Sequence, residues 1–359
     1  MATICRLDVL RVRNLSGVQI RPADRVNIIF GNNGSGKTSL LEAIYMLGLG
    51  RSFRSSKLDA VIDTSAEDCV IFADLGAGVT IGLNKSRKQG HVLKLLGERQ
   101  KSWVDTARHL PMQVINSDSF SLLEGSPRIR RRFLDWGVFH VEHEFALAWR
   151  KANKCLSQRN LLLKQRKLDR SQLVAWDSEF SDLGAQIDRH RDDYMRQFLP
   201  ILKDALPRLI EIPDLNIRYE RGWDSGLALE DALKASLDRD IRYGATQVGP
   251  HRADISIRIG RNAAADVLSR GQQKLLVSAM KIAQSQLLFK LTEEKGIYLI
   301  DDLPSELDSD NRGLICRLLE ELGCQIFITC VDANEIEKCW STDVSTDKFH
   351  VEHGKIAPQ

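Results

Sequence analysis

The clearest chemistry in this sequence belongs to one glycine-rich octapeptide, Gly31-Asn32-Asn33-Gly34-Ser35-Gly36-Lys37-Thr38. It matches the pattern G-x-x-x-x-G-K-[S/T] in full, follows a predicted strand and opens a predicted helix. Glycine lets successive N–H groups converge on phosphate oxygens, and the helix N-terminus adds a favourable dipole. Lys37 supplies a positive charge for the β- and γ-phosphates, and Thr38 a hydroxyl ligand for Mg²⁺. The context disfavours the alternative of an ordinary glycine-rich turn.

A pair of carboxylates ends an apolar run late in the chain, where Ile297 to Ile300 are followed by Asp301 and Asp302. A phosphate-loop enzyme needs an acidic residue at a strand end to hold Mg²⁺ through water, and we assign that role to Asp301. Asp302 is then placed to orient or deprotonate the attacking water. The alternative is an exposed turn, and the phosphate loop in the same chain makes it less favoured.

A third polar segment opens a long predicted helix: Leu268-Ser269-Arg270-Gly271-Gln272. Ser269 is a natural N-cap, so a simple capped helix is one interpretation. A serine hydroxyl and N–H groups at a helix N-terminus also form an anion site.

The elements that must position these motifs predict an α/β core. Apolar runs predict strands over 26–30, 69–75, 79–83, 92–96, 297–300 and 325–329, and helical spacing predicts helices from Ser39, over 271–291 and over 312–322. The alternation of strands and helices near the end of the chain favours parallel pairing. The glycine, lysine and arginine residues that separate the short strands over 69–96 favour an antiparallel meander. In residues 126–245, the spacing of apolar residues is mainly helical. We therefore predict a core of residues 1–125 and 246–359, and a mainly helical lobe over 126–245.

The composition excludes several classes of protein. The chain has 359 residues, of which 28% are charged and 43% hydrophobic, so a disordered or low-complexity chain is excluded. No apolar run approaches the ~18 residues that a membrane span needs, and the start has no secretory signal. Seven scattered cysteines without a Cys-x-x-Cys pair indicate reduced, buried thiols in the cytoplasm. A net charge of +3 decides little, so any nucleic-acid argument needs a local patch.

Taken together, the motifs resemble a known family. Leu-Ser-x-Gly-Gln at 268–272 resembles the ABC-type ATPase signature, and Ser305-Glu306-Leu307-Asp308 resembles the loop that follows the acidic strand. The whole chain resembles the RecF family of bacterial repair ATPases, within the SMC/Rad50 class. Further segments carry this resemblance: Gly50 to Arg54, Arg130 to Gly137, Gly249 to Asp254, and Asp301-Asp302.

The resemblance implies an ABC-type P-loop ATPase head, a mixed sheet with helices, with a mainly helical second lobe and no long coiled coil. It implies an ATP-dependent homodimer in which two heads associate head to tail. Gly31 to Thr38 would bind ATP in cis, with Asp301 holding Mg²⁺, while Ser269, Gly271 and Gln272 would bind the γ-phosphate in trans. It further implies action at gap junctions of double-stranded and single-stranded DNA, where the protein, with RecO and RecR, helps RecA to load, and a role in SOS induction.

Three departures from the general ABC pattern bear on catalysis. Arg270 replaces a glycine of the signature, which is itself typical of RecF. Asp302 stands where a catalytic glutamate is usual, and Thr329-Cys330 where transporters place a histidine. We therefore predict weak ATPase activity, with ATP acting mainly as a dimerisation ligand. The sensor residue that links nucleotide to the helical lobe is left open between Gln113 and Asp118.

A basic run predicts where DNA binds. Eight lysines and arginines against one aspartate lie between Arg150 and Arg170. The candidate contacts in and near this run are Arg130, Arg131, Lys151, Lys154 and Arg159. No base-reading module is present, so backbone and junction shape are the expected targets. A solvated helix face is the competing interpretation.

Two other functions compete with a DNA-repair clamp. One is the ATP-binding subunit of an ABC transporter, which shares the phosphate loop and signature. The unusual length, the basic insertion and the missing histidine count against it. The other is a non-enzymatic scaffold in which nucleotide merely stabilises the fold.

Overall fold

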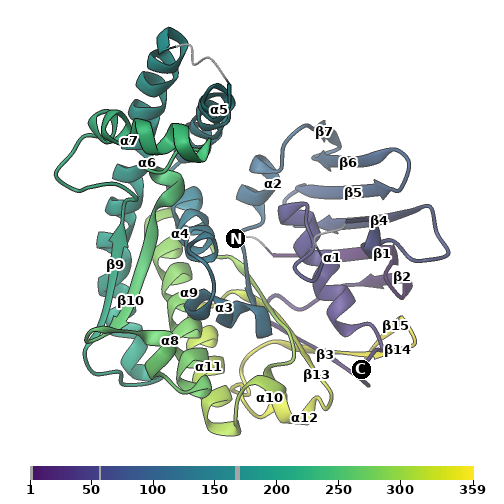
Figure 1. Ribbon diagram of the computed structural model, residues 1–359. Helices are drawn as coiled ribbons and strands as arrows, with labels where there is room; N and C mark the ends of the chain where they lie inside the picture. Colours follow the sequence, from purple (N-terminus) through teal and green to yellow (C-terminus); the bar gives the residue numbers. More distant parts are fainter. Residues whose placement is uncertain (1–2, 56–57, 166–169) are drawn as a thin grey trace. The chain divides into compact units, whose positions relative to one another are not determined.

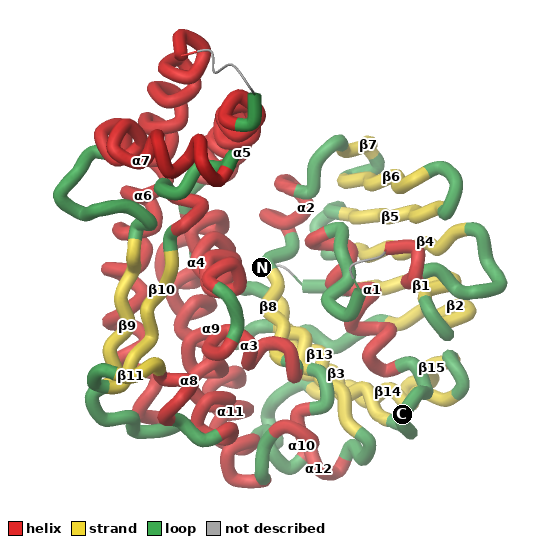
Figure 2. Tube along the Cα trace, in the orientation of Figure 1, coloured by secondary structure: helices red, strands yellow, loops and turns green. Residues whose placement is uncertain are grey.

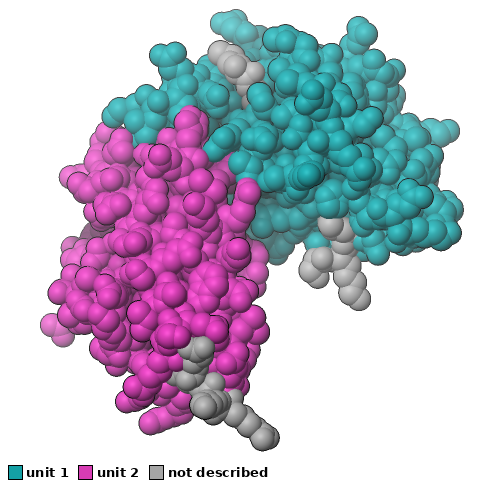
Figure 3. Space-filling model, turned by 90° about the horizontal axis from the view of Figure 1, so that it is seen from above, with its two compact units in different colours: residues 1–120, 274–359 teal, residues 121–273 magenta. Residues whose placement is uncertain are grey.

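The structure, a computed structural model, describes residues 3–55, 58–165 and 170–359. The chain divides into two compact units, shown in different colours in Figure 3. Unit 1 combines Met1–Phe120 with Lys274–Gln359, and unit 2 is Ser121–Gln273.

The first sheet of unit 1 is antiparallel throughout, with strand order β2-β1-β4-β5-β6-β7. Its strands are β1 (Arg6–Val12), β2 (Leu15–Ile20), β4 (Asp68–Asp74), β5 (Thr80–Ser86), β6 (Gly90–Leu95) and β7 (Glu98–Gln100). Buried residues alternate along β4, as expected when one face of a strand packs against a core. The predicted meander is confirmed in β4, β5 and β6.

The second sheet of unit 1 is mostly parallel, with strand order β15-β14-β3-β13-β12-β8. Its strands are β3 (Val26–Phe30), β8 (Met112–Ile115), β12 (Ile297–Ile300), β13 (Gln325–Cys330), β14 (Thr346–Glu352) and β15 (Lys355–Pro358). Only β15 runs antiparallel to its neighbour. Every residue of β12 and β13 is buried, which explains their unbroken apolar runs and confirms the parallel pairing.

Helix α1 (Lys37–Leu49) joins the two sheets of unit 1 into one core (Figure 1). Its side chains Leu40, Ile44 and Leu47 belong to a buried cluster that contains residues of both sheets. The remaining helices of unit 1 are α2 (Val104–His109), α10 (Leu303–Glu306), α11 (Ser309–Leu322), α12 (Asn334–Glu337) and most of α9 (Arg270–Thr292), with short 3₁₀ turns at Leu58–Val61 and Ser117–Phe120. Because α1 is enclosed in this way, the loop before it has a fixed position.

Unit 2 is mainly helical, as the red tubes of Figure 2 show. Its helices are α3 (Ser121–Glu124), α4 (Pro127–Val141), α5 (Phe145–Leu163), α6 (Arg170–Ala205), α7 (Leu229–Tyr243) and α8 (Ala264–Val267), with 3₁₀ turns at Leu206–Arg208 and Pro250–Arg252. A small antiparallel sheet accompanies them, built from β9 (Leu215–Glu220), β10 (Asp254–Ile259) and β11 (Asn262–Ala263).

The boundary of unit 2 differs from the predicted one. Residues 121–125 and 246–273 were expected in the core, but they belong to unit 2. For the second of these segments the reason is strand pairing: β10 pairs with β9 from Asp254↔Glu220 to Ile259↔Leu215. Strand β10 is also held from α4, where Arg130 forms a two-bond ion pair with Asp254.

Two expectations about the class of protein can be compared with the structure. Among the described residues, no helix combines the length and apolar character that a membrane crossing requires. All seven cysteines are free, and five are buried as predicted. Cys5 is exposed and Cys339 is partly exposed, so the expectation of burial fails for these two.

Candidate nucleotide site

The phosphate loop lies between the end of β3 and the start of α1, in unit 1. Gly31, Gly34 and Gly36 all have positive φ angles, of 143°, 78° and 125°. A Cβ on Gly31 would lie 2.3 Å from the carbonyl oxygen of Val351, and one on Gly36 would lie 2.9 Å from Leu15 Cδ2. Both conformation and space therefore require glycine at these two positions.

Lys37 is buried at the mouth of the loop and bonds back onto it. Its Nζ donates to the carbonyl oxygens of Gly31 (2.7 Å) and Asn32 (3.0 Å). Burial lowers the pKa of Lys37, and the negative charges of Asp302 and Asp301 oppose that shift. The ammonium is thus held where phosphate oxygens of a nucleotide in the loop would replace the carbonyl oxygens as its partners.

The structure brings together the two residues that we predicted as magnesium ligands. Thr38 Oγ1 donates to Asp301 Oδ1 at 2.9 Å, although the residues lie 263 positions apart. Thr329 Oγ1 donates to the same oxygen at 2.8 Å. The pKa of Asp301 is raised above its ordinary value, first by burial and also by the negative charge of Asp302, although the bonds from Thr329 and Thr38 oppose the shift. A hydroxyl and a carboxylate are hard oxygen donors, which suits Mg²⁺.

Asp302 has a strained backbone and a carboxylate oxygen without a partner. Its φ is 53°, in the left-handed region that residues with a side chain rarely adopt. Oδ2 accepts from Ser305 Oγ at 2.6 Å, whereas the buried Oδ1 has no hydrogen-bond partner among the residues that the structure describes. A buried acceptor without a partner is costly, so Oδ1 is suited to accept a bond from an incoming water.

Thr329 contacts both Asp301 and Asp302, which we did not predict from the sequence. The sequence pattern indicates it only as the replacement for a histidine. In the structure it is fully buried, donates to Asp301 and accepts a bond from the Asp302 backbone N–H at 2.8 Å. Thr329 therefore holds the carboxylate of Asp301 and the backbone of Asp302. Its place at the end of a predicted buried strand, level with the end of the acidic strand, was the available signal.

The sensor candidates differ sharply in their surroundings. Gln113 is buried within β8, and its Nε2 donates to Gln284 Oε1 at 3.0 Å. Asp118 is exposed in the turn after that strand. Gln113 and this turn both lie near the acidic strand: Gln113 pairs with Tyr298 of β12, and Asn116 follows Ile115, whose carbonyl oxygen accepts a bond from the Asp301 N–H at 2.9 Å. The choice of sensor between Gln113 and Asp118 therefore stays a prediction.

The signature segment lies in unit 2, at the exposed N-terminus of α9. The backbone N–H of Ser269 donates to Gln272 Oε1 at 2.9 Å, and the Gln272 N–H donates to Ser269 Oγ at 3.3 Å. This reciprocal cap fixes the first turn. Gly271 is exposed there, and Arg270 forms an ion pair with Glu124. The capped-helix interpretation is thus confirmed, and it leaves the helix terminus open to an anion.

The basic candidates for DNA binding separate into buried and exposed groups. Arg159 is fully buried and donates to Asp177 (2.6 Å), Asp240 (2.7 Å) and Thr246 (2.9 Å). The prediction of a DNA contact was therefore wrong for Arg159, because its charge is already neutralised inside unit 2. Arg166 and Lys167 of the basic run lie outside the described residues.

Arg130 and Arg131 are also engaged within unit 2. Arg130 pairs with Asp254 through two bonds of 2.7 and 2.8 Å, and Arg131 donates to the carbonyl oxygen of Ala253 at 2.6 Å. These contacts hold the start of β10 against α4. Lys151 and Lys154 are exposed on α5 and remain available as DNA contacts.

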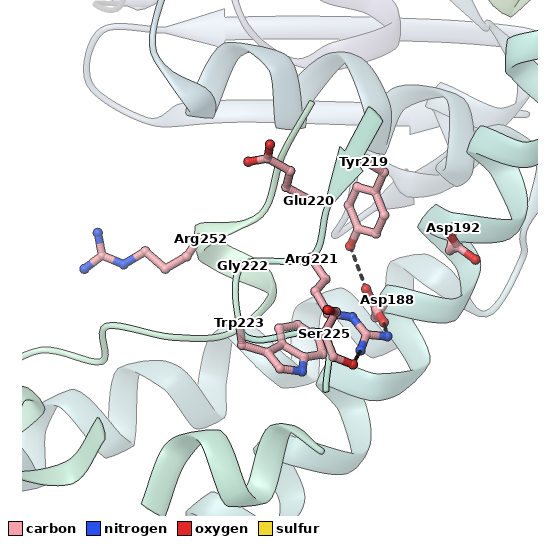
Figure 4. Close-up of a pocket in the computed structure, with 9 residues that line it drawn as sticks. All are labelled: Asp188, Asp192, Tyr219, Glu220, Arg221, Gly222, Trp223, Ser225 and Arg252. Atoms are coloured by element: carbon pink, nitrogen blue, oxygen red, sulfur yellow. Dashed lines mark hydrogen bonds and ion pairs between the residues drawn. The ribbon is translucent and has the colours of Figure 1, made fainter. Parts of the chain in front are cut away.

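A separate cavity of about 650 Å³ lies in unit 2, lined by α6 and by residues at and after the end of β9 (Figure 4). Asp188 accepts a bond from Tyr219 at 3.0 Å and forms an ion pair with Arg221. The Arg221 guanidinium also lies 4.9 Å from the centroid of the Trp223 ring. These groups satisfy one another, and no residue of the nucleotide motifs lines this cavity.

Comparison with known proteins agrees with this geometry. A family model described as "RecF/RecN/SMC N terminal domain" matches residues 3–356. Curated relatives named "DNA replication and repair protein RecF" include that of Pseudomonas paraeruginosa (strain DSM 24068 / PA7), 46% identical over 99% of this chain and 97% of the relative. That of Pseudomonas putida (strain W619) is 47% identical over 98% and 97%.

Solved structures extend the comparison. The structure titled "Structure of the recombination mediator protein RecF-ATP in RecFOR pathway" has a TM-score of 0.84 and 28% identity, covering 99% of this chain and 97% of the other. Its counterpart titled "RecF-ATPrS" has a TM-score of 0.83 and 26% identity, with full coverage of both chains. A Pyrococcus furiosus Smc head domain shares the fold, with a TM-score of 0.59 and 16% identity over 100% of this chain and 96% of that one.

The fold and the site thus define an ATPase head of the RecF/RecN/SMC class, with the predicted α/β core and mainly helical second part. Within that class, the chain belongs to the RecF family. This assignment disfavours the transporter alternative. The longest helix in the described part of the chain is α6, and no long coiled coil extends from the described helices.

Proposed function

We propose that this chain is an ATP-dependent DNA repair protein whose two copies close head to tail around ATP. One observation carries the proposal. The chain builds a phosphate loop beside Thr38 and Asp301 in one unit, and presents an open, capped helix terminus at Ser269 in the other. Related proteins have been solved as "RecF-ATP" and "RecF-ATPrS" complexes, which supports ATP as the ligand.

Each part of the site has its own role in this proposal. The loop from Gly31 to Thr38 binds the phosphates in cis, with Lys37 facing the β- and γ-phosphates. Thr38 and Asp301 hold Mg²⁺, which when bound neutralises phosphate charge. Ser269, Gly271 and Gln272 of the second copy bind the γ-phosphate in trans, through N–H groups and the helix dipole.

We propose that hydrolysis is slow and ends the dimer. Asp302 has one unpartnered oxygen with which to orient a water. Its other oxygen is engaged by Ser305, and the neutral Thr329 offers no base beside it. A single short carboxylate activates water weakly, so ATP persists as a dimerisation ligand. Loss of the γ-phosphate removes the contact with the signature and lets the copies separate.

The proposed substrate is gapped DNA, at junctions of its single-stranded and double-stranded parts in the cytoplasm. Lys151 and Lys154 are exposed on α5, and dimerisation doubles their number. Phosphate contacts of this kind recognise the backbone rather than the sequence. The relatives solved as mediators in the "RecFOR pathway" support RecO and RecR as partners, with RecA loading and SOS induction downstream.

Replacing Arg159 and replacing Lys154 are expected to affect different properties, stability in the first case and DNA binding in the second. Arg159→Ala leaves Asp240 and Asp177 without their cation, and should destabilise the protein by about 3–5 kcal/mol, as for other broken buried pairs. Lys154→Ala should leave stability within about 0.5 kcal/mol. It should also reduce the steepness with which the logarithm of the duplex-binding constant falls with the logarithm of salt concentration. The expected reduction is roughly 0.9 per protomer, the value for one phosphate contact. Urea unfolding and DNA titrations between low and moderate salt provide the two readouts. A stable Arg159→Ala protein with weakened DNA binding would reverse our correction for this residue.

The experiment that tests the whole proposal measures the mass of the protein in solution. Light scattering after size exclusion is run with no nucleotide, with ADP and with a non-hydrolysable ATP analogue, each with and without gapped duplex. We expect dimer only with the ATP analogue, and more dimer when gapped DNA is present. A protein that stays monomeric in all six conditions contradicts the proposal. Equal dimer formation with no nucleotide, with ADP and with the ATP analogue contradicts the role given to the γ-phosphate.

A further inference from the structure

The carbonyl groups at the tip of the phosphate loop are held by residues from both ends of the chain. When the N–H groups of a loop converge on phosphates, its carbonyl groups turn outward and need other partners. Ser35 is only 8% exposed, so water cannot readily serve its carbonyl. The partners found there are Asn14, which lies between β1 and β2, and Gly354, in the turn between β14 and β15.

Asn14 makes three hydrogen bonds that fix its side chain. Nδ2 donates to the carbonyl oxygens of Gly34 (3.2 Å) and Ser35 (3.0 Å). Ser39 Oγ, in the first turn of α1, donates to Asn14 Oδ1 at 3.0 Å. Because that hydroxyl bonds the amide oxygen, the amide nitrogen faces the loop. Asn14 thus links the loop to the helix that follows it.

The phosphate loop and the turn at Gly354 lie close to Asn14. The N–H of Gly354 donates to the Ser35 carbonyl oxygen at 2.9 Å, and a Cβ on Gly354 would lie 1.9 Å from the Asn14 carbonyl oxygen. A Cβ on Gly36 would lie 3.2 Å from Asn14 Nδ2. Loop, turn and Asn14 are therefore in direct contact, and hydrogen bonds rather than burial hold the exposed Asn14 side chain.

We propose that Asn14 is a positioning residue for nucleotide binding, which keeps the loop carbonyls turned away from the phosphates before the nucleotide arrives. This inference rests on the proposed ATP site. A loop that is already ordered pays less conformational entropy on binding, so the ligand binds more tightly. The backbone of such a loop holds the α- and β-phosphates, which ADP and ATP share. Loss of Asn14 should therefore weaken both nucleotides by the same factor.

Asn14→Asp is the sharpest test, because it replaces the amide nitrogen with an oxygen and changes little else in shape. The carboxylate still accepts from Ser39, but it opposes the carbonyls of Gly34 and Ser35. We expect the Kd values of ADP and ATP to rise by about tenfold for Asn14→Ala, with two bonds lost, and by more for Asn14→Asp. Titration with fluorescent ADP and ATP analogues measures both. Asn262→Asp, an exposed asparagine of unit 2, is the matched control and should bind normally.

Ser39→Ala provides a second variant that keeps the asparagine. Without the hydroxyl, the amide of Asn14 is free to turn, so affinity for both nucleotides should fall by about threefold. In a protein that already carries Ser39→Ala, adding Asn14→Ala should then raise the Kd values by a smaller factor than it does in the unaltered protein. If Asn14→Asp and Ser39→Ala bind ADP and ATP as the unaltered protein does, while Lys37→Ala does not bind, the inference is wrong and the ATP site stands. If the unaltered protein binds neither nucleotide, both proposals fail together.

Discussion

Lys37→Ala is expected to abolish ATP binding at micromolar protein, with a loss of affinity of about 100-fold. The reason is that a charge-assisted bond to phosphate contributes about 1.5–3 kcal/mol, and the ammonium serves two phosphates. Within the described chain, the same Nζ donates to the carbonyl oxygens of Gly31 and Asn32. Removing it should leave the fold intact, because a buried charge disappears along with its desolvation cost. Titration with a fluorescent ATP analogue measures the loss.

Lys338→Ala is the matched control, since Lys338 is an exposed lysine of the same unit. It should bind ATP as the unaltered protein does. ATP should raise the thermal unfolding temperature of the control but not that of Lys37→Ala. Undiminished ATP binding by Lys37→Ala would show that the octapeptide is not the nucleotide site.

Ser269→Asp should keep ATP binding within about twofold and yet abolish ATP-driven dimerisation. Aspartate is as good an N-cap as serine, so the first turn of α9 should persist. Its negative charge, however, would repel the γ-phosphate that the second copy presents. Ser269→Phe should lose dimerisation as well, by bulk instead of charge, with about 1 kcal/mol of stability lost with the cap. ATP affinity by titration and mass by light scattering separate the two effects.

Ser16→Asp, at an exposed serine of β2, is the control for the added charge and should dimerise normally. The decisive comparison is between the binding of ATP by a single copy and the ATP-driven association of two copies. A Ser269→Asp protein that dimerises with ATP as readily as this control would remove the signature from the interface. A Ser269→Asp protein that no longer binds ATP as a monomer would place Ser269 in the cis site, against our assignment.

The motifs and most of the helices and strands could be predicted from the amino-acid sequence. The phosphate loop, the Asp301-Asp302 pair and the signature were each recognisable because their chemistry depends on residues only a few positions apart. The strands and helices of the core were predictable for a similar reason: a parallel strand buried on both faces, such as β12, requires an unbroken apolar run. The roles assigned to the site residues stay predictions, whereas the fold and the family are confirmed.

The tertiary structure alone decided which distant residues meet. Thr329 and Thr38 converge on Asp301 only because β13 and β12 are neighbours in the sheet and α1 packs beneath it. In the same way, β10 joins unit 2 by pairing with β9, a choice that no local pattern reveals. Arg159 looked exposed within a basic run, but two aspartates from other helices make its burial possible. Each outcome depends on a partner far away in the chain, and the energy of such a contact is absent from the local sequence.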